Sequence, residues 1–207
     1  MQLSSMIGAR TATTKLVNVS GKNVLLSERF DRDGTQRIPY MSAMSMMQAK
    51  DEDEEHSYLE IADLITKFGV QNDKMELFKR VVYNVLIHNV DDHLKNHGFL
   101  LNNNQWVLSP AFDLNPVSNS EFLSLNITDI DRMATIDNCL ELTDYLDINI
   151  DSAKEYILSA ANVISSNWRI IAQSVRISSS EIDRMSSAFE HDEMQNALSL
   201  SNGYGRR

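Results

Sequence analysis

Residues 89–96 read Asn-Val-Asp-Asp-His-Leu-Lys-Asn, and residues 108–114 read Leu-Ser-Pro-Ala-Phe-Asp-Leu. The first stretch follows the clearest helical pattern in the chain, which runs from Asp73 to about His88 with apolar residues at helical spacing. The second follows two short β-prone runs, 98–101 and 106–108, joined by turn-forming residues. This order of helix, polar loop and small hairpin predicts that two acids and an amide converge.

Those residue types suit phosphoryl transfer, in which a carboxylate positions a hydroxyl nucleophile and an amide and a second acid hold magnesium against phosphate oxygens. Asp91 fits the first role, and Asn96 and Asp113 fit the metal-binding roles because Mg²⁺ prefers oxygen ligands. Lys95 is placed to neutralise charge on the transferring group. Each residue alone has an ordinary explanation as a cap or turn residue. The combination favours the functional interpretation.

The rest of the chain predicts an α+β protein whose body is mostly helical. A β-hairpin is expected over residues 12–30, and Pro39 suits the first turn of a helix through Met47. Ser57 and Glu60 form a capping box for a helix to Phe68. The remaining expectations are an irregular chain from Pro116 to about Leu140 and helices over 152–175 and 180–200.

Composition narrows the class of protein. The 207 residues are 43% apolar, which is ordinary for a folded protein, and carry a formal net charge of −10. That charge argues against direct nucleic-acid binding. The single cysteine, Cys139, is interpreted as a small buried hydrophobe. No apolar run has the length of a membrane span, and the N-terminus lacks the pattern of a secretory signal, so we expect a cytoplasmic protein.

Three segments, 27–32, 85–98 and 108–114, together resemble the HipA-like serine/threonine kinases of bacterial toxin–antitoxin systems. The resemblance implies the C-terminal lobe of a kinase that uses ATP and Mg²⁺, phosphorylates protein Ser or Thr, and is restrained by a small antitoxin. It makes Asp91 the catalytic acid and assigns no role to Asp92. The nucleotide-site residues it implies are Glu28, Arg29 and Phe30 against adenine, His93, Lys95 and Phe112 along the phosphates or base, and Asn96 and Asp113 on magnesium.

The resemblance also implies a division of the chain. Residues 1–32 are expected to be a remnant of the N-terminal lobe with hairpin and hinge, 33–200 the helical lobe, and 201–207 a disordered tail. No glycine-rich phosphate loop precedes the hinge, and Lys15 and Lys22 lie on the wrong strand pair for the phosphate-binding lysine. We therefore expect this polypeptide alone to transfer phosphate very poorly, and a separate N-lobe polypeptide is one partner to consider.

Several alternatives remain open or are disfavoured. One is a degenerate lobe that binds an antitoxin or substrate without catalysis, and another is a small-molecule phosphotransferase. A zinc site of His88, His93 and His97 is disfavoured because structural zinc wants four N or S ligands. A Ser-His-Asp hydrolase is set aside because no Gly-x-Ser-x-Gly turn is present.

Overall fold

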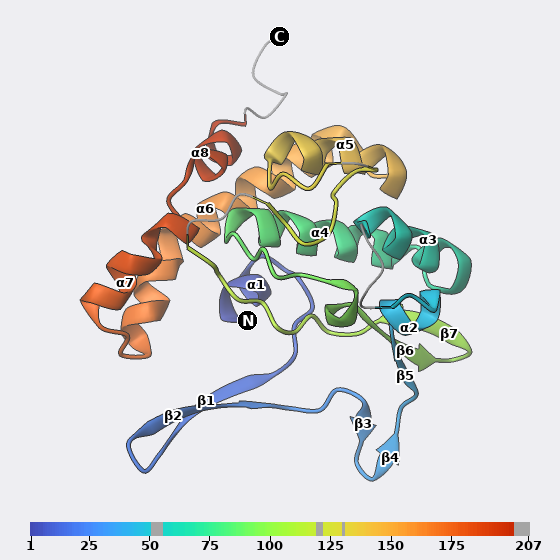
Figure 1. Ribbon diagram of the computed structural model, residues 1–207, viewed down its shortest axis with the longest axis horizontal. Helices are drawn as coiled ribbons and strands as arrows, with labels where there is room; N and C mark the ends of the chain where they lie inside the picture. The colour runs from blue at the N-terminus through green and yellow to red at the C-terminus, as the bar shows by residue number, and fades with distance from the viewer. Residues whose placement is uncertain (51–55, 119–121, 130, 201–207) are drawn as a thin grey trace.

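A computed structural model describes residues 1–50, 56–118, 122–129 and 131–200, as drawn in Figure 1. Its helices are α1 (Gln2–Met6), α2 (Ala43–Met47), α3 (Tyr58–Phe68), α4 (Asn72–Leu86), α5 (Ile136–Leu146), α6 (Ile150–Ser174), α7 (Ser179–Met185) and α8 (Asp192–Ser199), with 3₁₀ turns η1 (Leu94–Asn96) and η2 (Ser186–Ala188). Its strands are β1 (Thr14–Val19), β2 (Lys22–Ser27), β3 (Arg32–Asp33), β4 (Gln36–Arg37), β5 (Tyr40–Ser42), β6 (Gly98–Asn102) and β7 (Gln105–Leu108). The predicted α+β class with a helical body is confirmed.

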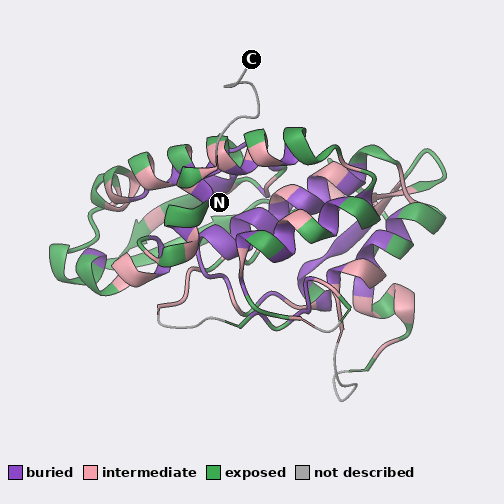
Figure 2. Cartoon of the chain, turned by 90° about the horizontal axis from the view of Figure 1, so that it is seen from above, coloured by how far each residue is buried: buried purple, intermediate pink, exposed green. Residues whose placement is uncertain are grey.

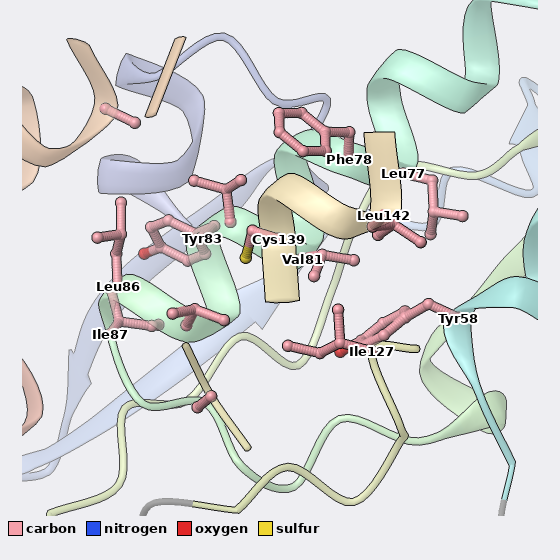
Figure 3. Close-up of a cluster of buried hydrophobic side chains, with 14 of the residues drawn as sticks. Tyr58, Leu77, Phe78, Val81, Tyr83, Leu86, Ile87, Ile127, Cys139 and Leu142 are labelled. Atoms are coloured by element: carbon pink, nitrogen blue, oxygen red, sulfur yellow. The ribbon is translucent and has the colours of Figure 1, made fainter. Parts of the chain in front are cut away.

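The core is built around α4, which lies among α3, α5, α6 and α8. The apolar side of α4 packs Leu77, Phe78 and Val81 away from solvent, and Cys139 of α5 lies among them, as expected (Figure 3). Seen from above, the helices turn their buried faces toward one another (Figure 2). A second side of α4 is buried too, although it carries Asp73, Glu76, Arg80 and Asn84. A polar face that is taken from water needs partners, and those partners build the site.

The small sheet has three strands in the order β5–β6–β7. The predicted helix from Pro39 was wrong in its first turn, because Tyr40–Ser42 instead pairs antiparallel with β6, Met41 opposite Phe99. The helix begins at Ala43, where the Ser42 hydroxyl accepts the Ser45 N–H. Strand pairing therefore overrides the local helix signal.

The β1–β2 hairpin projects away from the helical body (Figure 1). It is a two-stranded sheet whose turn uses Ser20 and Gly21 at positive φ. All six residues of β2 are exposed, including Leu25 at 61% and Leu26 at 51%. The hairpin thus presents apolar side chains to solvent.

Two further expectations need correction. The chain is not irregular up to Leu140, because α5 begins at Ile136, with the Thr135 side chain as its N-cap. The last predicted helix is interrupted: after α7 and η2, Phe189 stacks on Trp168 of α6 with ring centroids 4.6 Å apart, and a new helix begins at Asp192. Residues 201–207 lie outside the described residues, and the division at residue 32 stays a prediction. Within the described parts of the chain, none of the helices could cross a bilayer.

Candidate active site

The loop after α4 separates two adjacent acids. Asp91 is exposed, whereas Asp92 is 2% exposed. Asn96, at the end of η1, is buried and its amide donates to the Asp91 carbonyl at 3.4 Å. The loop therefore holds one carboxylate in the core and leaves the other, the predicted catalytic acid, accessible.

Asp113 lies in a segment that docks on this loop. The Val117 N–H donates to the His88 carbonyl at 3.1 Å, and the Asn115 N–H donates to Asn89 Oδ1 at 3.4 Å. Asp113 is exposed and has φ +56°, a left-handed conformation that Asp adopts more readily than most residues. Its Oδ1 accepts the Asn115 side-chain N–H at 2.6 Å. The structure thus brings the predicted second acid to the edge of the loop.

Upstream, charged groups on the polar side of α4 hold the same segment. Asp73 accepts the Leu108 N–H at 2.7 Å and also pairs with Arg10. Arg80, fully buried, donates to the Ser109 carbonyl and to Glu76. These contacts account for the burial of Asp73, Glu76 and Arg80 and fix where the connection from β7 to Asp113 begins.

Asp92 is the centre of a buried hydrogen-bond network. Its Oδ2 accepts from Tyr58 Oη at 2.7 Å and from Asn84 Nδ2 at 2.8 Å, and lies 2.7 Å from His97 Nε2. Burial opposes ionisation of Asp92, but the charge and hydrogen bonds of its neighbours, His97 foremost, bring its pKa below the ordinary value. Sequence reasoning gave Asp92 no role. Its partners His97, five residues further on, and Tyr58, 34 residues earlier, carried no signal that could have revealed the network.

An aromatic pocket forms at the predicted hinge. A cavity of about 300 Å³ is lined by residues 27–31, Tyr40 and Phe112. The ring centroid of Phe30 lies 5.7 Å from that of Phe112 and 6.0 Å from that of Tyr40. Among the described residues, no hydrogen bond occupies the Glu28 carbonyl or the Phe30 N–H. A planar ring with a donor and an acceptor on one edge would match this pocket, and Tyr40 is a residue the sequence reasoning missed.

One predicted hinge residue, Arg29, is engaged by a neighbouring side chain. Arg29 forms a two-pronged ion pair with Asp31, at 2.6 and 2.8 Å, and this hydrogen bonding lowers the pKa of Asp31 to about 2. Phe112 and Ser27 also line a second cavity of about 1050 Å³ between the hairpin, α1 and residues 113–115. Asp113 therefore opens into a large space next to the aromatic pocket.

The remaining predicted residues lie on the loop and line neither of these two cavities. His93 caps η1 and its buried Nδ1 has no hydrogen-bond partner among the described residues, while Lys95 is exposed. The structure therefore groups Glu28, Phe30 and Phe112 at one place, and it joins the Asp113 segment to the loop that carries Asp91 and Asn96. The convergence of Asp91, Asn96 and Asp113 stays a prediction.

The donor set fits magnesium better than zinc. Within the described ranges, Asp113 Oδ2 and Asn96 Oδ1 accept no hydrogen bond, so one carboxylate and one amide oxygen are available. The same ranges hold no group of three or more His, Cys, Asp or Glu side chains arranged for a metal. Two histidines of the zinc alternative have other partners: His97 Nε2 lies against Asp92, and the His88 ring stacks on His191 with centroids 3.7 Å apart.

Comparison with known proteins places the fold. The sequence profile described as HipA-like C-terminal domain matches residues 1–177. The chain belongs to this family. A solved structure similar to this HipA-like domain is HipA from Shewanella oneidensis MR-1, determined with HipB and its operator DNA, with 18% sequence identity and a TM-score of 0.74. The alignment covers 97% of this chain and 53% of that chain, so the domain spans about half of that HipA.

A search of curated proteins finds no match. The Shewanella complex contains DNA, and it therefore lends no support to our expectation that this domain does not bind nucleic acid. At this level of identity the likeness establishes the fold, which is the predicted kinase-type C-terminal lobe of the HipA family.

Proposed function

We propose that this domain is the C-terminal lobe of a serine/threonine protein kinase that uses ATP and Mg²⁺. The observation that carries the proposal is the docking of residues 115 and 117 on residues 88 and 89, which joins the segment of Asp113 to the loop that carries Asp91 and Asn96. The aromatic pocket at the hinge adds a place for a purine ring. These features support binding and orientation of a nucleotide beside an accessible acid.

Each residue has a chemical task in this proposal. Asp91, exposed at the loop, accepts the hydrogen of the substrate hydroxyl as it attacks phosphorus. Lys95 and His93 lie along the same loop and contribute positive charge or N–H donors toward phosphate oxygens. Asp113 Oδ2 and Asn96 Oδ1 would hold the Mg²⁺, which when bound offsets phosphate charge. Phe30 and Phe112 hold the base, and the Glu28 carbonyl and Phe30 N–H read its edge.

The exposed hairpin supports a partner for this lobe. Leu16, Val24 and Leu26 are 39–51% exposed on a sheet of two strands, and an isolated hairpin of this kind is marginal in water. Exposed strand edges bind further strands. We propose that a β-rich segment covers the hairpin and supplies the phosphate-binding groups, either from the same protein or as a separate polypeptide.

The antitoxin and the substrate protein are proposals of the same kind. The Shewanella HipA was solved with HipB, and by analogy this domain would be restrained by a small antitoxin. A non-catalytic lobe that docks such a partner is the rival candidate, and the apolar hairpin favours it equally. A cytoplasmic location stays an expectation.

Nucleotide binding separates the two candidates. Calorimetry of the purified chain with Mg²⁺-ATP should show saturable binding that is weakened in Phe30→Ala and in Asp113→Asn, with Asn102→Ala, on the small hairpin, as control. Asp113→Asn is chosen over Ala because Asn also tolerates positive φ. No binding to a folded chain would reject the kinase proposal in favour of the docking module.

Activity gives the second test. With labelled ATP and a Ser/Thr-containing protein mixture, we expect very weak transfer by this chain alone, and none from Asp91→Ala. If the chain alone transfers phosphate robustly and Asp91→Ala abolishes that activity, the expectation of weak transfer is overturned, but the role of Asp91 as the catalytic acid is supported. Phosphorylation of small alcohols instead of protein would point to the small-molecule phosphotransferase.

A further inference from the structure

A path of hydrogen bonds through Asn84, Asn89 and Asn115 joins the buried carboxylate of Asp92 to the exposed carboxylate of Asp113. Asn84 Nδ2 donates to Asp92, and Asn84 Oδ1 accepts from Asn89 Nδ2 at 3.0 Å. Asn89 Oδ1 accepts the Asn115 backbone N–H, and Asn115 Nδ2 donates to Asp113 Oδ1 at 2.6 Å. The path crosses from α4 to the loop and on to the Asp113 segment.

The orientations of the Asn84 and Asn89 amides are dictated from Asp92, and that of the Asn115 amide is dictated from Asp113. An ionised carboxylate can only accept, so Asn84 must turn its nitrogen toward Asp92 and its oxygen toward Asn89. Asn89 must then present its nitrogen to Asn84 and its oxygen to Asn115. The backbone N–H of Asn115 donates to that oxygen, and the Asn115 side chain turns its nitrogen toward Asp113, whose carboxylate also only accepts. An aliphatic residue could not relay this polarity.

The burial along the path differs from end to end. Asn84 and Asn89 are each 1% exposed and immobilised in the core, whereas Asn115 and Asp113 are exposed. A surface carboxylate usually samples several rotamers, which weakens its binding to a cation. Here the core holds Asn115 at its backbone, and Asn115 in turn holds one oxygen of Asp113, leaving Oδ2 for a ligand.

We infer that Asn89 and Asn115 are positioning residues that orient Asp113 toward the metal of the nucleotide complex. This inference rests on the proposed function, since it needs Asp113 to bind a metal. Hydrogen-bonded groups behind a metal ligand typically contribute about 10–100-fold to metal affinity. Because Asn115 is exposed, we expect the lower end of that range.

The probe is Mn²⁺, a paramagnetic substitute for Mg²⁺, titrated into the full chain at saturating ATP and followed by electron paramagnetic resonance. In Asn115→Ala the apparent Mn²⁺ affinity should fall about 10-fold. ATP affinity without metal and the melting temperature should stay at wild-type values. Asn89→Ala should show a similar loss, and Asn102→Ala, an exposed asparagine outside the path, should show none.

The outcomes are distinguishable. If wild type binds no Mn²⁺ with ATP, or Asp113→Asn binds it as well as wild type does, the proposed function and this inference both fail. If Asp113→Asn loses the metal but Asn115→Ala stays within twofold of wild type, the inference alone is overturned. Asn115→Ala changes an exposed side chain, so it decides the question even if Asn89→Ala does not fold.

Discussion

Replacing Asp92 with alanine should destabilise the protein severely, whereas replacing its neighbour Asp91 should not. Asp92→Ala leaves the hydroxyl of Tyr58, the amide of Asn84 and the ring of His97 without their acceptor in the core. Tyr58 and Asn84 retain one bond to each other, at 3.2 Å, which limits the loss. Each buried donor left unpaired costs about 1–3 kcal/mol.

Two to three such groups give a loss of about 3–5 kcal/mol, the same range as breaking a buried charge pair. For a chain of this size each kcal/mol lowers the melting temperature by about 2–4 °C, so Asp92→Ala should melt roughly 6–20 °C lower. Asp92→Asn keeps an acceptor oxygen and should lose less. Asp91→Ala removes an exposed side chain and should change the free energy of unfolding by no more than about 0.5 kcal/mol.

The assay is urea unfolding followed by far-ultraviolet circular dichroism, with the slope against urea compared among the three variants and wild type. A common slope shows that the change lies in the folded state. A loss below about 1 kcal/mol for Asp92→Ala, or an equal loss for Asp91→Ala, would refute the assignment of Asp92 as the anchor of the loop. In the proposed kinase, Asp91→Ala should abolish transfer at unchanged stability.

Three other predictions follow from single groups. The pKa of Asp92 is lowered below 3.8, so the ionised carboxylate stabilises the protein above that pH and this contribution is lost as the pH falls further. Acid unfolding followed by circular dichroism should therefore begin below about pH 4 and be less steep in Asp92→Asn. Burial and the neighbouring His191 lower the pKa of His88 from 6.5 to about 4, so the unfolded chain takes up a proton first and stability should decline from pH 6.5 to 4. His88→Asn, which tolerates the φ of +48°, should flatten that decline, and an unchanged profile would contradict it. A Cβ at Gly98 would lie 2.2 Å from the Tyr40 ring, so Gly98→Ala should displace that ring. Calorimetry should then show weaker ATP binding, while the free energy of unfolding falls by less than about 1 kcal/mol. An ATP affinity equal to that of wild type would count against the aromatic pocket as the nucleotide site.

The parts of the fold that sequence predicted are those whose signals are local. The box of Ser57 and Glu60 forms as expected, with the Ser57 N–H donating to Glu60 at 2.8 Å, and α3 ends at Phe68 before Gly69. A Cβ on Gly69 would meet the Ile65 carbonyl at 2.9 Å, which explains why a glycine follows the helix. Periodicity likewise located α4 and the β6–β7 hairpin within a residue or two.

The misplaced elements depend on distant partners. Tyr40–Ser42 becomes a strand because β6, almost sixty residues later, offers its edge. The break between α7 and α8 contains neither glycine nor proline; it occurs where Phe189 turns onto Trp168. Tertiary packing decides both cases, and the local sequence of neither segment contains a signal for it.

The site shows the same limit at the scale of one residue. Asp91 and Asp92 are identical in type and adjacent, and the sequence could assign the catalytic role to one of them by spacing but could not say what the other does. The structure shows that Asp92 is held by three donors: Tyr58 of α3, Asn84 of α4 and His97, which follows η1. With that carboxylate fixed inward, the backbone beside it is fixed too, and Asp91 has solvent as its remaining direction. The orientation of the proposed catalytic acid is therefore a consequence of its neighbour's burial, and loss of the Asp92 anchor should disorder Asp91 before it unfolds the chain.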